Sequence, residues 1–199
     1  VHHHYPDPSS GAIRTVEKVI DTDEGPRRDT TPEALGKLRP VFRTDGVVTA
    51  GTSSQMSDGA GALVMVSEAA LKKYDLEPIA VFRGFSVAGV PPEIMGIGPI
   101  AAIPKVLQQT GISLDQLDWI ELNEAFAAQA LAVIRDVGLD PDKVNPLGGA
   151  IALGHPLGAT GSILSAKLIH GMRRRKQKYG MVTMCIGTGM GAAGIIEAL

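Results

Sequence analysis

The sequence has 199 residues, 44% of them hydrophobic, and a formal net charge of −2. This length can bury one good-sized core, so we expect one compact domain with attached segments. A charge so near zero points away from nucleic acid and from a membrane surface as the main partner. No apolar run reaches the roughly 18 residues that a membrane-spanning helix needs.

Cysteine, histidine and arginine usage gives three further expectations. Cys185 is the only cysteine, so no disulfide can form within the chain, and a reducing compartment is expected. Residues 1–4 show no signal-peptide pattern, and we interpret their histidine run as a tag remnant rather than a metal site. The basic run at 173–176 ends an apolar helical pattern, which favours an exposed helix C-terminus over a polyanion site.

Residues 1–60 are predicted to be mostly irregular. Within them, Thr31 is a candidate N-cap for a short helix that begins at Pro32. The stretch 47–61 is rich in glycine, serine and threonine. Because such a polar stretch rarely folds alone, we expect it to lie across a larger body or a partner subunit.

The remainder, 61–199, alternates strand and helix patterns and is predicted to be one domain. Strands are expected at 63–66, 79–87, 118–122, 181–185 and 194–199, and helices at 68–74, 100–109, 124–137 and 156–172. This alternation favours a layered α/β fold. The last two strands have no helix between them and should form a hairpin, which predicts a mixed sheet packed by helices.

Three polar or glycine-rich segments follow predicted strands, where α/β folds place their sites. The first is Asn123-Glu124-Ala125-Phe126. The neutral amide of Asn123 could orient a water or a carbonyl group. The alternative is a plain helix N-cap, which on this segment alone is the favoured interpretation.

The second segment is Gly148–Gly161, with His155 followed by Pro156 at the expected helix start. A histidine at a helix N-terminus lies in positive potential, which keeps the ring neutral. A neutral ring can take a proton from a thiol or donate to a developing oxyanion. A purely structural histidine is an equal alternative, and no Gly-Lys-Ser/Thr follows, which excludes a Walker A loop.

The third segment is Cys185-Ile186-Gly187-Thr188-Gly189-Met190-Gly191. A strand rather than a helix is expected after it, which excludes a dinucleotide fingerprint. A lone cysteine at a strand end is ordinarily a small buried hydrophobe. The glycines that follow leave backbone N–H groups free to face an anion, as an oxyanion hole requires.

Taken together, these segments closely resemble those of the thiolase family. The ordered motifs are Asn-Glu-Ala-Phe at 123–126, Gly-His-Pro-Leu-Gly at 154–158 and Cys-Ile-Gly-Thr-Gly-Met-Gly at 185–191, with further similarity at 48–59 and 95–99. The similarity runs from about residue 21 to residue 199. It implies the second half of a thiolase fold, with residues 1–60 supplying the tail of a loop region and a linker.

The resemblance also implies residue roles. His155 would activate a nucleophilic thiol and help bind the thioester oxygen, and Cys185 would act as general acid and base. Asn123 would hold a water in one oxyanion hole, and the Gly187 N–H would serve the other. The pantetheine and acyl channel would be lined by Ser54, Met95 and Phe126. Coenzyme A is then a substrate, with no tightly bound cofactor and no metal expected.

The chain departs from the family in two respects. Thiolases use another cysteine as the acylated nucleophile, and Cys185 already fills the other position. We therefore expect a fragment or one piece of a split enzyme, inactive alone, that needs an N-terminal half and forms a homodimer or homotetramer. Thr52 stands where asparagine is common in the family, a small polar change.

Within the family, 23–29 and 53–58 look more like degradative 3-ketoacyl-CoA thiolases than biosynthetic acetoacetyl-CoA ones. A non-catalytic acyl-CoA-binding module is a second hypothesis, against which the trio Asn123, His155 and Cys185 argues. Condensing enzymes of fatty-acid synthesis are a third, but they typically carry a histidine at the position of Cys185. The expected location is the cytoplasm for a bacterial protein, or an organelle matrix for a eukaryotic one.

Overall fold

The computed structural model describes residues 1–23 and 25–199, and these form two compact units, 1–30 and 31–199. The first unit contains an antiparallel hairpin of β1 (His2–Pro6) and β2 (Ile13–Glu17), with His2 opposite Glu17. We predicted no strand here. Every strand residue is exposed, so the hairpin has no buried face and the sequence shows no apolar alternation to reveal it.

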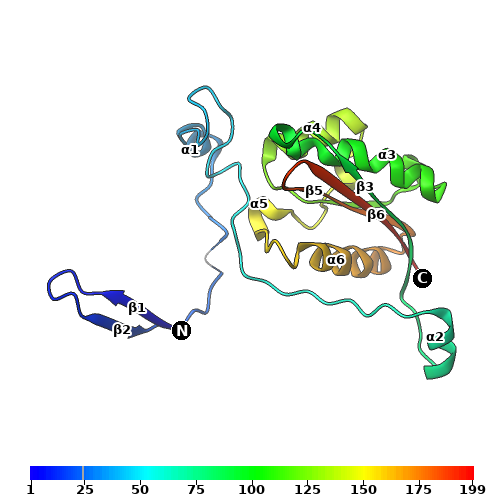
Figure 1. Ribbon diagram of the computed structural model, residues 1–199, viewed down its shortest axis with the longest axis horizontal. Helices are drawn as coiled ribbons and strands as arrows, with labels where there is room; N and C mark the ends of the chain where they lie inside the picture. The colour runs from blue at the N-terminus through cyan, green and yellow to red at the C-terminus, as the bar shows by residue number, and fades with distance from the viewer. Residues whose placement is uncertain (24) are drawn as a thin grey trace. The chain divides into compact units, whose positions relative to one another are not determined.

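The second unit is built on a four-stranded mixed sheet (Figure 1). In spatial order its strands are β3 (Ala80–Gly89), β6 (Met190–Ala198), β5 (Tyr179–Ile186) and β4 (Trp119–Leu122). Strands β5 and β6 form an antiparallel hairpin, β3 pairs antiparallel with β6, and β4 pairs parallel with β5. The predicted α/β class, mixed sheet and terminal hairpin are therefore confirmed.

Helices cover both faces of the sheet (Figure 1). On one face lie α3 (Gly98–Thr110) and α4 (Ala127–Val137), and on the other lies α6 (Thr160–Arg175). The shorter helices are α1 (Pro32–Gly36), α2 (Glu68–Tyr74), η1 (Pro92–Ile97), η2 (Leu114–Gln116), η3 (Pro141–Lys143) and α5 (Ala150–Leu153). Among the described residues, no helix is long and apolar enough to cross a membrane.

The alternating side chains of β4 divide the core in two. Ile120 and Leu122 belong to the apolar cluster under α3 and α4, whereas Trp119 belongs to the cluster under α6. Trp119 is fully buried, its indole lies where a Cβ on Gly171 would fall, and the Arg175 guanidinium lies 4.7 Å from its ring centroid. Burial on both faces explains why strand β4 reads as a nearly continuous apolar run.

Several predicted boundaries are confirmed. The Thr31 hydroxyl accepts from the Ala34 N–H at 3.1 Å and caps α1. Gly111 and Gly138 end α3 and α4 with positive φ, as helix C-caps commonly do. The basic run at 173–176 is exposed at the end of α6.

Three predictions about the elements are wrong. Residues 63–66 form no strand and are exposed, because no strand in the described part of the chain pairs with them. Helix α4 begins at Ala127 rather than at residue 124, because the backbone of 125–127 bonds to that of 52–54 instead. Helix α6 begins at Thr160 rather than at Pro156, because 157–159 form a turn first.

Candidate active site

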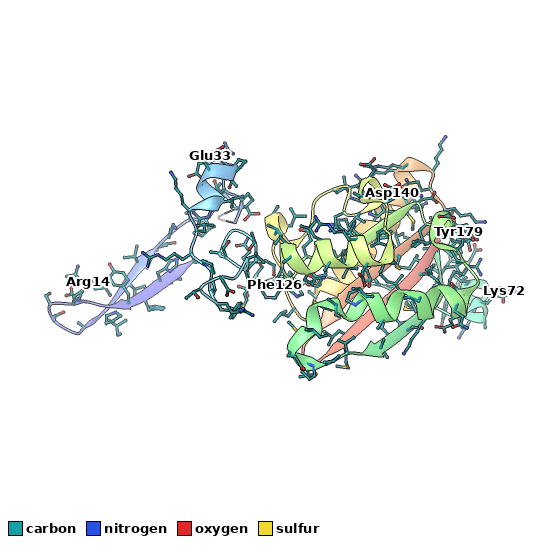
Figure 2. The ribbon with its side chains drawn as sticks, turned by 90° about the horizontal axis from the view of Figure 1, so that it is seen from above. Arg14, Glu33, Lys72, Phe126, Asp140 and Tyr179 are labelled. Carbon is teal, nitrogen blue, oxygen red and sulfur yellow. The ribbon has the colours of Figure 1, made fainter. Side chains whose placement is uncertain are left out.

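The site lies at one end of the sheet, beyond the last residues of two parallel strands. Strand β4 ends at Leu122, and the Asn123 N–H then donates to the Thr183 carbonyl of β5 at 2.9 Å. Cys185 follows two residues later on β5. Figure 2 shows Phe126 at this end of the unit and Tyr179, the first residue of β5, at the opposite end. The carboxyl ends of parallel strands thus bring Asn123 and Cys185 to one edge.

Asn123 and His155 are in direct contact. The Asn123 side chain is 1% exposed, and its Nδ2 lies 3.2 Å from the His155 Nε2. The N-cap alternative is wrong, because the N-cap position of α4 is Phe126. The Asn123 Oδ1 is buried and has no hydrogen-bond partner among the described residues. A buried amide with an unpartnered oxygen costs stability, which is a reason to look for its use in chemistry.

Polar contacts hold the backbone N–H and both ring nitrogens of His155. Its backbone N–H donates to the Gln55 carbonyl at 3.0 Å, and its Nδ1 lies 2.7 Å from the Thr160 hydroxyl. Burial lowers the pKa of His155 below its ordinary value, so the ring is neutral at pH 7. Because α6 begins five residues after His155, burial rather than the start of a helix keeps the ring neutral.

Glu124 supports the loop that leads to His155. Its carboxylate accepts from the Asn145 amide at 2.9 Å and from the Ile151 N–H at 3.1 Å. A Cβ on Gly149 would lie 2.1 Å from the Glu124 carboxyl carbon, so a larger residue there would displace the carboxylate from these hydrogen bonds. The sequence analysis did not predict these hydrogen bonds of Glu124. Their only signal in the sequence is an acidic residue beside Asn123, followed later by a pair of glycines.

A buried ion pair between Lys167 and Glu121 also holds this loop in place. Lys167 of α6 donates to the Gly148 carbonyl and lies 2.7 Å from the Glu121 carboxylate. The Trp119 indole N–H donates to the other oxygen of Glu121 at 2.7 Å. Burial raises the pKa of Glu121, and the Lys167 ammonium opposes that rise. These contacts tie β4 and α6 to the loop of the site.

Cys185 is half-buried near the end of β5, opposite Gly191 of β6. Burial raises the pKa of its thiol, so the thiol is protonated at neutral pH. In the turn that follows, space beside Gly187 is open, whereas a Cβ on Gly191 would lie 2.0 Å from the Gly98 backbone. Gly191 is thus explained by close packing, and of these two glycines Gly187 alone has open space beside it. No group of metal ligands occurs among the described residues.

The three predicted channel residues lie on different segments. The Ser54 hydroxyl donates to the Ala125 carbonyl at 3.2 Å, and neighbouring Ser53 bridges to Phe126. Met95 lies in η1, which packs against α4. Thr52 uses its hydroxyl to close the turn at 47–52 and its carbonyl to accept from the first N–H of α4. Segment 47–61 therefore lies across the sheet domain, as predicted.

Comparison with known proteins connects this geometry to one family. The thiolase C-terminal domain model matches residues 76–198, and the thiolase N-terminal domain model matches 8–69. The chain is 55% identical to a 3-ketoacyl-CoA thiolase of Bacillus subtilis, over 90% of this chain and 46% of the relative. It is 52% identical to the mitochondrial 3-ketoacyl-CoA thiolase of Bos taurus, over 92% and 46%.

Solved structures agree with the sequence matches. The human mitochondrial 3-ketoacyl-CoA thiolase in complex with CoA superposes with a TM-score of 0.87 at 51% identity, over 90% of this chain and 46% of the other. A Bacillus anthracis acetyl-CoA acetyltransferase gives 0.86 at 45% identity, over 100% and 49%. The chain thus spans less than half the length of these proteins. The chain matches the thiolase domain models, is more than 50% identical to several thiolases and shares their fold. It therefore belongs to the thiolase family.

Proposed function

We propose that the chain is the C-terminal part of a 3-ketoacyl-CoA thiolase. The reaction is the CoA-dependent cleavage of a 3-ketoacyl-CoA into acetyl-CoA and a shortened acyl-CoA. The observation that carries the proposal is the contact between Asn123 and His155, with Cys185 on the neighbouring strand end. The names of the relatives support the degradative subtype over a biosynthetic acetoacetyl-CoA thiolase, although an acetyl-CoA acetyltransferase is also among the similar structures.

In the first half-reaction, His155 accepts the proton of a nucleophilic cysteine thiol. The thiolate attacks the β-carbonyl carbon of the substrate, and the bond between the α- and β-carbons breaks. The electron pair goes to the α-carbon, and the acyl group stays on the thiol as a thioester. A neutral ring is required for the proton transfer, and burial supplies it by lowering the pKa of His155.

Cys185 then moves the second proton. Its thiol protonates the α-carbon of the leaving group, which departs as acetyl-CoA. The resulting Cys185 thiolate takes the proton of an incoming CoA thiol, which attacks the acyl thioester and releases the shortened acyl-CoA. The displaced nucleophilic cysteine takes its proton back from His155, which restores both groups. Burial raises the pKa of the Cys185 thiol, so it holds its proton at pH 7 until a strong base such as a carbanion forms.

The remaining groups stabilise charge and bind substrate. The unpartnered Oδ1 of Asn123 can accept from a water that faces one thioester oxygen. The backbone N–H of Gly187, with open space beside it, serves a second oxyanion. Ser54, Met95 and Phe126 line the path of the pantetheine and acyl groups. Coenzyme A enters as substrate, and no tightly bound cofactor is needed.

The nucleophilic cysteine must come from outside this sequence, because Cys185 is its only cysteine. The required partner is an N-terminal thiolase half, in an assembly of two or four copies. We place the boundary between linker and C-terminal domain at residues 60 and 61. The protein would act in the cytoplasm of a bacterium or in an organelle matrix of a eukaryote.

The test is CoA-dependent thiolysis of acetoacetyl-CoA and of a longer 3-ketoacyl-CoA. The purified chain is assayed alone and after addition of the N-terminal part of the B. subtilis relative that it does not cover. Turnover only in the mixture, lower by at least about a hundredfold in His155→Ala and in Cys185→Ala, is expected. Faster cleavage of the longer substrate supports the degradative subtype.

Two results would contradict the proposal. Turnover by the chain alone that is lost in Cys185→Ala would make Cys185 the nucleophile. Absence of turnover in the mixture, together with a higher melting temperature in the presence of an acyl-CoA, would favour a binding module. Ser86→Ala is the matched control, because the Ser86 hydroxyl on β3 donates to Gln109 at 2.8 Å and its side chain bonds no site residue among the described ones.

A further inference from the structure

The Thr160 hydroxyl lies between His155 and a backbone carbonyl. Thr160 is the first residue of α6 and is 4% exposed. Its Oγ1 lies 2.9 Å from the Pro156 carbonyl and 2.7 Å from the His155 Nδ1. Because a carbonyl can only accept, the hydroxyl proton points at Pro156, and the oxygen presents its lone pairs to the ring. This contact requires a proton on Nδ1.

The contact on the other side of the ring independently indicates the same tautomer. The Asn123 Nδ2 carries only donors and lies 3.2 Å from the His155 Nε2. A proton on Nε2 would set two donors against each other in a site where Asn123 is buried and His155 is half-buried. The Nε2 must therefore be the bare nitrogen, with its lone pair available.

We propose that Thr160 is a positioning residue that fixes His155 in the tautomer with the proton on Nδ1. This inference rests on the proposed function only in what the bare Nε2 is for, namely acceptance of a thiol proton. The tautomer itself follows from two contacts on opposite sides of the ring. Thr160 does not touch the reacting atoms, so it acts through the imidazole alone.

The test measures where the ring proton is. The chain is labelled with ¹⁵N-histidine, and long-range ¹H–¹⁵N correlation spectra are recorded at about pH 7.5, above the ordinary histidine pKa. The His155 signals are those lost in His155→Gln. The expected result is Nδ1 protonation in the wild type and in Thr160→Ser, which keeps the hydroxyl. In Thr160→Val, which keeps the shape, the ratio of tautomers should shift toward Nε2 by about fivefold or more.

Asn123→Asp is a second variant, because an acceptor in place of the donor should draw a proton to Nε2. A proton on Nε2 in the wild type would overturn the inference, even if Thr160→Val failed to fold. An unchanged ratio in a folded Thr160→Val would overturn it as well. Since no substrate is needed, the tautomer result stands if the thiolysis assay fails. In the reconstituted enzyme, Thr160→Val should lower kcat more than it changes KM, and Thr160→Ser should restore kcat.

Discussion

At the scale of single residues, the site depends on the protonation state of the His155 imidazole. His155 is surrounded by a buried amide, a hydroxyl and the backbone of segment 55–56, and it faces no carboxylate among these contacts. Burial without a negative partner favours the neutral ring. The same burial that prepares the base must therefore cost stability when the ring is protonated.

This cost predicts acid sensitivity. The folded-state pKa of His155 is lowered, so the unfolded chain binds the proton first as the pH falls below about 6.5. The free energy of unfolding should therefore fall between pH 7 and pH 5, by at most about 1.4 kcal/mol per pH unit from this group. Urea unfolding across this range measures it. His155→Gln should flatten the slope, and a slope equal to wild type would contradict the assignment.

At the scale of elements, two glycines set the distance between β6 and α3. A Cβ on Gly191 would lie 2.0 Å from the Gly98 carbonyl carbon, and a Cβ on Gly98 would lie 2.3 Å from the Met190 oxygen. Both obstacles are backbone atoms, which cannot rotate away. The hairpin that carries Cys185 is thus seated directly on the first turn of α3.

Gly191→Ala should consequently destabilise the chain by about 3 kcal/mol or more, because the helix must move away from the sheet. Denaturant unfolding followed by circular dichroism measures this. Gly187→Ala, in the turn between β5 and β6, is the matched control, since nothing lies within 4 Å of its Cβ, and it should change stability by no more than about 0.5 kcal/mol. Similar losses in both variants would show that the close approach is not the cause.

Sequence alone predicted the elements whose signals are local. Strands β4, β5 and β6 were predicted from their apolar runs. The C-terminal ends of α3 and α4 were predicted from Gly111 and Gly138. It failed where a distant segment decides the conformation. Residues 124–126 stay non-helical because residues 125–127 bond to 52–54, and the hydrogen bonds of Glu124 depend on a loop 21 to 27 residues later.

The site was predicted unevenly for the same reason. Motif similarity selected Asn123, His155 and Cys185, because each stands in a distinctive string. Thr160 was not selected, because the predicted helix 156–172 places it inside the first turns of a helix, where a threonine suggests no special role. Its importance depends on the position of its hydroxyl between the His155 ring and the Pro156 carbonyl, which no sequence pattern indicates.

At the scale of the whole molecule, the chain exposes apolar residues where the sequence predicted a buried strand. The side chains at 63–66 are 43% to 91% exposed, with Val64 the highest. Their backbone pairs with no strand of the described residues. An unpaired apolar stretch of high β-propensity is a template for pairing with another chain.

We therefore expect self-association of the isolated chain through this stretch. Val64→Lys should shift sedimentation-velocity profiles toward the monomer, because a charge opposes strand pairing between copies. Val19→Lys is the matched control, since Val19 is 81% exposed but lies in the first unit. A monodisperse wild-type monomer, or an equal effect of the two substitutions, would contradict this expectation.

The burial of Trp119 has a practical consequence. It is the only tryptophan in the sequence, and it lies fully enclosed between β4 and α6, against Gly171 and under the Arg175 guanidinium. Because residues 1–30 contain no tryptophan, indole emission reports on the sheet domain alone. A shift of that emission to longer wavelength marks the moment when water reaches the layer beneath the site. Trp119 fluorescence can therefore report whether the packing of β4 against α6 is intact.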